Sequence, residues 1–203
     1  MYDMLVKGGV VMVPIGICSV LAFAVIVERL WSLRVQQIIP QQEITHIESL
    51  VKRGRITEAR EVCQANPSNS SYRRIILSGL EKAGERRQVI KDVVEESGRQ
   101  EVVHLERFLT LLGTIASITP LLGLLGTVMG MIKVFATISS FGVGDPSVLA
   151  SGIGESLITT AAGLSVAIPS VIFHRHFNRV IDRHVVSLER SALVVIEQIK
   201  SGH

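Results

Sequence analysis

One stretch of the chain, residues 146–173, is apolar or small throughout and carries a single ionisable side chain, Glu155. Asp145 followed by Pro146 is typical of a helix start, an N-cap residue before proline at the first helical position. As a helix the stretch would be about 42 Å long, more than the roughly 30 Å hydrocarbon core of a bilayer. Glu155 would lie about 13.5 Å below the helix start, which is close to the midplane of the membrane.

Two interpretations of Glu155 remain open. An ionised carboxylate at that depth costs on the order of 3 kcal/mol, so the side chain needs a polar partner, an aqueous cavity or a proton. One interpretation is a structural acid, protonated and hydrogen-bonded to a neighbouring helix. The other is a carboxyl that binds and releases protons. We favour the second, because ionisable residues inside membranes commonly mark ion or proton pathways.

The rest of the composition indicates a membrane protein with a helical soluble part. Hydrophobic residues make up 47% of the chain and charged residues 19%, and the two kinds are segregated along the sequence. Apolar residues concentrate in three blocks, and the sequence therefore predicts an all-α membrane protein with three transmembrane helices. The predicted spans are residues 10–31, 108–138 and 146–173.

The distribution of basic residues predicts the topology. Lysine and arginine crowd residues 32–107 and recur in residues 174–203, whereas residues 139–145 contain neither. By the positive-inside rule, residues 1–9 and the loop 139–145 are external, and residues 32–107 form a cytoplasmic helical domain. Residues 174–203 form a cytoplasmic C-terminal helix, and the second and third membrane helices both extend into the cytoplasm. The net charge of +3 therefore reports topology and does not indicate a nucleic-acid partner.

Small residues recur at helical spacing in the second and third spans. Such stripes let two helices approach closely, and the loop between these spans is short, so we expect a close antiparallel pair. The helix-packing residues are Gly123, Gly126 and Gly130 in the second span and Gly152, Ser156 and Gly163 in the third.

Two threonines fall at depths close to that of Glu155. Measured along each helix, Thr127 lies between Glu155 and Thr160, so the three side chains are candidates for one polar layer on a proton pathway. The alternative for each threonine is a hydroxyl bonded to its own helix backbone, which is common in membrane spans. Lys133 lies roughly 9 Å below the outer end of the second span. We expect it to extend outward to the interface rather than pair with Glu155.

No residue pattern indicates covalent chemistry, a metal or a cofactor. The six histidines lie in predicted cytoplasmic or interfacial segments, and their spacing does not suit a metal site. The sequence has no phosphate-binding glycine loop, nucleophile elbow or paired catalytic carboxylates, so an enzyme is not expected. Charged residues before the second span are expected to form a solvated, ion-paired surface: Glu95, Glu96, Arg99, Glu101 and Arg107.

Several segments together carry a family resemblance. PLLGLLGTVMGMIKVF (residues 120–135) and GIGESLITTAAGLSVAIPSV (residues 152–171) resemble the ExbB/TolQ/MotA family of proton-channel motor proteins. ERLWSLR (28–34) and GRITEAREVCQANP (54–67) are also similar to that family. Three predicted spans, with a large cytoplasmic loop after the first, fit the ExbB/TolQ branch, whereas MotA-type proteins have four spans.

The resemblance implies a homopentamer in the bacterial inner membrane that encloses single-span ExbD/TolR-type subunits bearing an essential aspartate. It implies that Glu155 is the family's intramembrane acid and that Thr127 and Thr160 are its pore-lining threonines. Proton motive force would then drive work on a TonB-like protein for outer-membrane import. The alternatives are a TolQ-like role with a TolA-like partner in envelope integrity, and a passive membrane scaffold in which Glu155 is structural.

Overall fold

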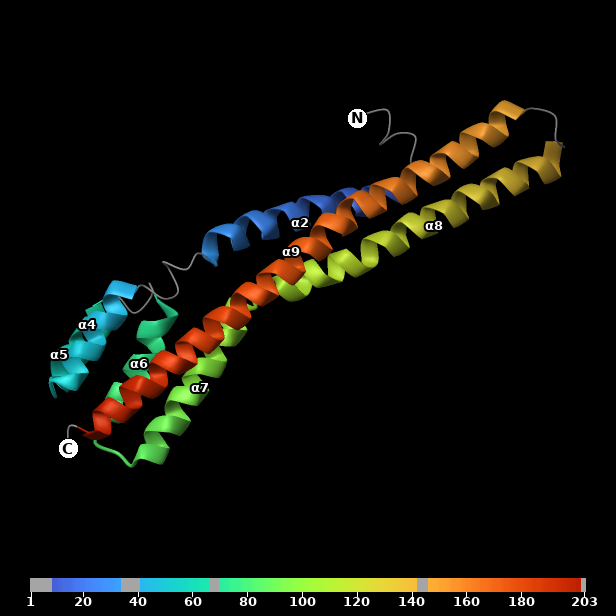
Figure 1. The fold of residues 1–203 in the computed structure, drawn as a ribbon. Helices are drawn as coiled ribbons and strands as arrows, with labels where there is room; N and C mark the ends of the chain where they lie inside the picture. Colours follow the sequence, from blue (N-terminus) through green and yellow to red (C-terminus); the bar gives the residue numbers. More distant parts are fainter. Residues whose placement is uncertain (1–8, 34–40, 66–69, 142–145, 202–203) are drawn as a thin grey trace. The chain divides into compact units, whose positions relative to one another are not determined.

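The computed structural model describes residues 9–33, 41–65, 70–141 and 146–201. Within these residues the chain forms seven α-helices and no β-strand, which confirms the predicted all-α class (Figure 1). Residues 1–8 of the predicted external N-terminus and residues 142–145 of the predicted external loop lie outside the described residues. The helices are α2 (Met12–Ser32), α4 (Gln41–Lys52), α5 (Ile56–Ala65), α6 (Ser71–Glu81), α7 (Arg87–Leu105), α8 (Leu109–Phe141) and α9 (Pro146–Ser201).

Three of these helices, α2, α8 and α9, are long and apolar enough to cross a membrane. They coincide with the three predicted spans. Helix α9 contains 56 residues and is therefore about 84 Å long, far more than a bilayer core requires. The third span thus continues, as expected, without interruption beyond its apolar part.

The second span does not continue in the same way, and the prediction of an unbroken helix was wrong. Helix α7 ends at Leu105, α8 begins at Leu109, and Phe108 between them has a φ of 66°. A bulky residue rarely adopts this left-handed conformation, and no glycine or proline in the sequence indicates it. Arg29, which is only 4% exposed, donates a hydrogen bond of 2.8 Å from Nη1 to the carbonyl oxygen of Leu105. This bond satisfies one of the carbonyls that the end of a helix leaves unpaired.

The chain divides into two compact units, which are described separately. The span unit contains α2 as far as Glu28, α8, and α9 as far as His176. The domain unit contains the end of α2 from Arg29, helices α4 to α7 and the remainder of α9.

In the domain unit, α6 packs against both α5 and α7, and α4 packs against α5. The close contact of α6 with α7 depends on Gly79, because a methyl group there would lie 2.8 Å from Val94 Cγ2. The fully buried apolar side chains of these helices include Ile47, Ala59, Cys63, Tyr72, Ile76, Leu80 and Ile90.

Two arginines of α6 form bidentate ion pairs inside the domain unit. Arg73 binds Glu43 at 2.7 and 2.6 Å, and Arg74 binds Glu101 with both bonds at 2.6 Å. Glu101 is only 8% exposed, so the expectation of a solvated side chain was wrong for this residue. Its partner Arg74 is distant in sequence, and helix spacing within α7 gives no sign of the contact. The pairing with Glu101 also raises the pKa of Arg74.

Two acidic groups in this core lose their protons only at higher pH because they are buried. Burial raises the pKa of the Cys63 thiol from 9.0 to about 11, with Arg73 opposing the shift, and burial also raises the pKa of Tyr72. The folded state therefore holds the thiol proton more tightly than the unfolded chain does. This contribution to stability is complete below pH 9 and is lost as the pH rises toward 11.

We expect the free energy of unfolding to fall between pH 9 and pH 11, with Cys63 contributing up to about 1.4 kcal/mol per pH unit. Thermal unfolding of the full chain in detergent, followed by circular dichroism across this range, measures the fall. Cys63→Ala is the matched control and should show a shallower loss, since only Tyr72 then remains among the two buried acids. Equal slopes for both proteins would contradict this account of Cys63.

Candidate functional site

Helices α8 and α9 of the span unit approach each other through glycines. A methyl group at Gly126 would lie 2.6 Å from Thr159 Cβ, and one at Gly163 would lie 2.6 Å from the carbonyl oxygen of Thr119. A methyl group at Gly123 would lie 3.1 Å from Thr160 Cα. The backbones are therefore close enough that larger side chains at these positions would force the helices apart.

Nearer the connection between α8 and α9, the same helix contact involves Gly130 and Gly152. A methyl group at Gly130 would collide with the Ser156 hydroxyl, and one at Gly152 would collide with Val134. All six predicted helix-packing residues thus lie between α8 and α9. Val134 directly follows Lys133, and Gly152 lies three residues, nearly one helical turn, before Glu155, so this contact brings the two charged residues near each other.

Hydroxyl groups cross or line this helix contact. Thr160 Oγ1 donates a hydrogen bond of 3.1 Å to the carbonyl oxygen of Gly123 on the opposite helix. Thr159, which sequence reasoning missed, is 1% exposed and bonds to the carbonyl oxygens of Glu155 and Ser156 at 2.8 and 3.0 Å. The sequence offered two signals for Thr159: its small size and its position between Ser156 and Gly163, two of the small helix-packing residues of the third span. These bonds satisfy the Thr159 hydroxyl within α9, about one turn from Glu155.

The hydroxyl of Thr127 is hydrogen-bonded within its own helix. Its hydroxyl donates to the carbonyl oxygen of Leu124 in its own helix at 2.6 Å, while its own carbonyl oxygen accepts a longer bond of 3.5 Å from Ser156. Among the described contacts, neither Thr127 nor Thr160 is hydrogen-bonded to the carboxyl of Glu155. The three residues therefore share one helix contact without forming a hydrogen-bonded chain in this state.

The carboxyl of Glu155 pairs with Lys133. Lys133 Nζ lies 3.0 Å from Glu155 Oε1, and the exposed fractions of the two side chains are 60% and 27%. The expectation that Lys133 would extend outward instead was wrong for this structure. The reason is geometric, because the Gly152–Val134 contact brings the two helices close enough for the lysine stem to reach across.

A third segment, at Gly9 three residues before the start of α2, also lies against this carboxyl. Gly9 has a φ of +67°, and a methyl group there would collide with Glu155 Oε1 and lie 3.9 Å from Lys133 Nζ. Only glycine combines this backbone conformation with so close an approach. Sequence reasoning did not select Gly9, since a glycine near a chain end is usually a turn residue. The ion-pair site thus consists of Gly9, Lys133 and Glu155.

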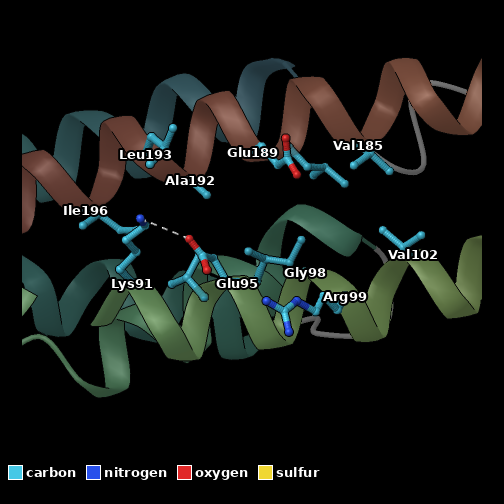
Figure 2. A pocket seen from close by; sticks show the side chains of 13 residues that line it. Lys91, Glu95, Gly98, Arg99, Val102, Val185, Glu189, Ala192, Leu193 and Ile196 are labelled. Atoms are coloured by element: carbon cyan, nitrogen blue, oxygen red, sulfur yellow. Dashed lines mark ion pairs between the residues drawn. The ribbon is translucent and has the colours of Figure 1, made fainter. Parts of the chain in front are cut away.

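The described residues offer no second constellation of this kind. They contain no group of three histidine, cysteine, aspartate or glutamate side chains that could hold a metal ion. In the domain unit, α7 and the C-terminal part of α9 border a groove of about 470 Å³ with an apolar floor (Figure 2). Its rim carries Glu189 and Arg99 and an ion pair of 3.4 Å between Lys91 and Glu95, all solvent-exposed.

These features define a multi-pass helical membrane protein with an ion pair between two of its spans. Residues 67–190 match the model of the MotA/TolQ/ExbB proton channel family. A Synechocystis sp. protein named as the biopolymer transport protein ExbB-like 1 is 35% identical over 181 residues, which are 85% of this chain and 68% of that protein. The biopolymer transport protein exbB1 of Vibrio cholerae is 31% identical over 183 residues, which are 88% and 79% of the two chains.

The chain therefore belongs to the MotA/TolQ/ExbB proton channel family, a transport family and not an enzyme family. The family resemblance noted in the sequence is confirmed. The matched region includes α8 and the part of α9 that carries Glu155.

We expect Gly126→Ala to lower the thermal stability of the full chain, because the added methyl group would overlap Thr159 and overpacking costs about 1–3 kcal/mol. Gly154→Ala is the matched control, since a methyl group at Gly154 on the same pair of helices meets nothing within 4 Å. Unfolding temperatures in detergent compare the two variants. An equal effect of both substitutions would show that α8 and α9 do not approach as described.

Proposed function

We propose that this chain is the proton-channel subunit of an ExbB–ExbD-type motor that converts proton motive force into mechanical work on a TonB-like protein. The observation that carries the proposal is the pairing of Glu155 with Lys133 in the apolar spans of a proton-channel family member. In this role Glu155 binds and releases protons, and the hydroxyls of Thr127 and Thr160 line the path.

The energetics support a proton carrier. A carboxylate and an ammonium in an apolar span are each costly alone and become tolerable as a pair. A pair of opposite charges can open when a proton neutralises the carboxylate, whereas a purely apolar contact offers no such step. A proton that crosses the membrane releases about 2.3 kcal/mol per 100 mV, enough to drive such a change repeatedly.

The proposed assembly is a homopentamer in the bacterial inner membrane. Its N-terminus faces the periplasm, and residues 32–107 and 174–203 face the cytoplasm, as the distribution of basic residues indicates. The pentamer encloses single-span ExbD/TolR-like subunits, whose intramembrane aspartate would complete the proton path. Support for these partners comes from the family membership and from relatives named ExbB.

A TolQ-like role in envelope integrity is the second candidate. The family description includes TolQ as well as ExbB, and the ion-pair site would serve either machine in the same way. The relatives with ExbB names favour the import role.

We expect Glu155→Gln to assemble normally, because an amide has nearly the same size and shape as a carboxyl group. We expect it to abolish proton flow, because an amide does not bind and release a proton as a carboxyl group does. The measurement is potential-driven proton uptake into proteoliposomes that contain the chain together with its single-span partner subunit.

Glu85→Gln, at an exposed carboxyl between α6 and α7, is the control and should retain wild-type flow. Normal proton flow through Glu155→Gln would contradict the proposal and leave Glu155 a structural side chain, as in the passive-scaffold alternative.

A further inference from the structure

The two charged residues of the ion-pair site have no competing counter-ion in the neighbouring spans. Residues 12–27 contain no charged side chain, residues 109–141 contain only Lys133, and residues 146–173 contain only Glu155. The third element at the site, Gly9, contributes backbone alone. Lys133 is therefore the one cation that these described segments present to the carboxyl.

The two side chains differ in how tightly the protein holds them. Glu155 is 27% exposed and lies between Lys133 and the backbone of Gly9, whereas the Lys133 side chain is 60% exposed. A lysine stem has four rotatable carbons and can carry its ammonium toward the membrane interface while the stem remains in apolar surroundings. From the depth of Lys133, the interface is within roughly 9 Å. The same residue thus has two favourable positions, one on Glu155 and one at the interface.

We propose that Lys133 is a positioning residue that switches Glu155 between a paired, ionised state and a released state that accepts a proton. This inference rests on the proposed function and adds the regulation of its proton-binding carboxyl. In the paired state, the ammonium stabilises the carboxylate and holds it against Gly9. When Lys133 moves to the interface, the carboxylate loses its counter-ion in an apolar environment and takes up one proton, which becomes the O–H of the neutral acid. Lys133 keeps its own protons throughout.

A hydrophobic carbodiimide tests the switch, because such reagents modify protonated carboxyl groups in apolar surroundings and spare ionised, paired ones. The probe is dicyclohexylcarbodiimide, applied to the full chain purified with its single-span partner subunit in lipid vesicles, with modification at Glu155 followed by mass spectrometry. We expect slow modification in the wild type. Removal of a partly buried counter-ion should accelerate it by about tenfold in Lys133→Met.

Two further variants keep the test specific. Lys133→Arg retains a cation that can pair with a carboxylate and should remain nearly as protected as the wild type. Lys133→Gln is polar but uncharged and should behave like Lys133→Met, which separates the loss of charge from the loss of packing. Normal assembly of each variant is checked by its elution with the partner subunit.

Equal rates of modification in the wild type, Lys133→Met and Lys133→Gln would overturn the inference, as would equal acceleration in Lys133→Arg. Neither result would contradict the proposed function, because that proposal is tested separately by the loss of proton flow in Glu155→Gln. Conversely, intact proton flow in Glu155→Gln with a tenfold difference in labelling would leave Lys133 as the counter-ion and remove the motor role.

Discussion

The organisation of the span unit depends on one electrostatic constraint, namely that a carboxylate in apolar surroundings must have a partner. Glu155 meets that requirement with Lys133 at 3.0 Å, across the contact between α8 and α9. An isolated charge at the centre of a membrane span costs about 3 kcal/mol or more, and charged residues in spans are therefore usually paired. The pair is therefore the part of the span unit that a proton can change.

The pair in turn depends on the glycines that bring the helices together. At Gly123, Gly126 and Gly163 the opposite backbone or a threonine side chain occupies the space that a methyl group would need. Thr159 and Thr160 lie in this contact. The Thr159 hydroxyl bonds to a backbone carbonyl of its own helix α9, and the Thr160 hydroxyl bonds to the carbonyl oxygen of Gly123 in α8. This packing fixes the distance between α8 and α9, across which the Lys133 side chain reaches Glu155. While the helix packing is intact, the pair can open only by a movement of the two side chains.

Much of this arrangement follows from the sequence. Apolar length predicts α2, α8 and α9, and helical spacing predicts the small-residue stripes. Three features were beyond sequence reasoning because they depend on distant or special contacts. Lys133 pairs with Glu155 only because of the close helix approach, Glu101 is buried by Arg74 from another helix, and the break at Phe108 has no glycine or proline to announce it.

The most direct test of the central claim is the distance between the side chains of Lys133 and Glu155 in a lipid bilayer. Solid-state NMR with ¹⁵N in the lysine ammonium and ¹³C in the glutamate carboxyl measures it in the assembled protein, with labelled chains diluted among unlabelled ones to isolate contacts within one chain. The account predicts a dipolar coupling between the ¹⁵N and ¹³C labels. This coupling would correspond to an ion pair whose nitrogen and oxygen atoms lie within about 4 Å of each other. No contact, with the Glu155 carboxyl exposed to the lipid acyl chains, would contradict it.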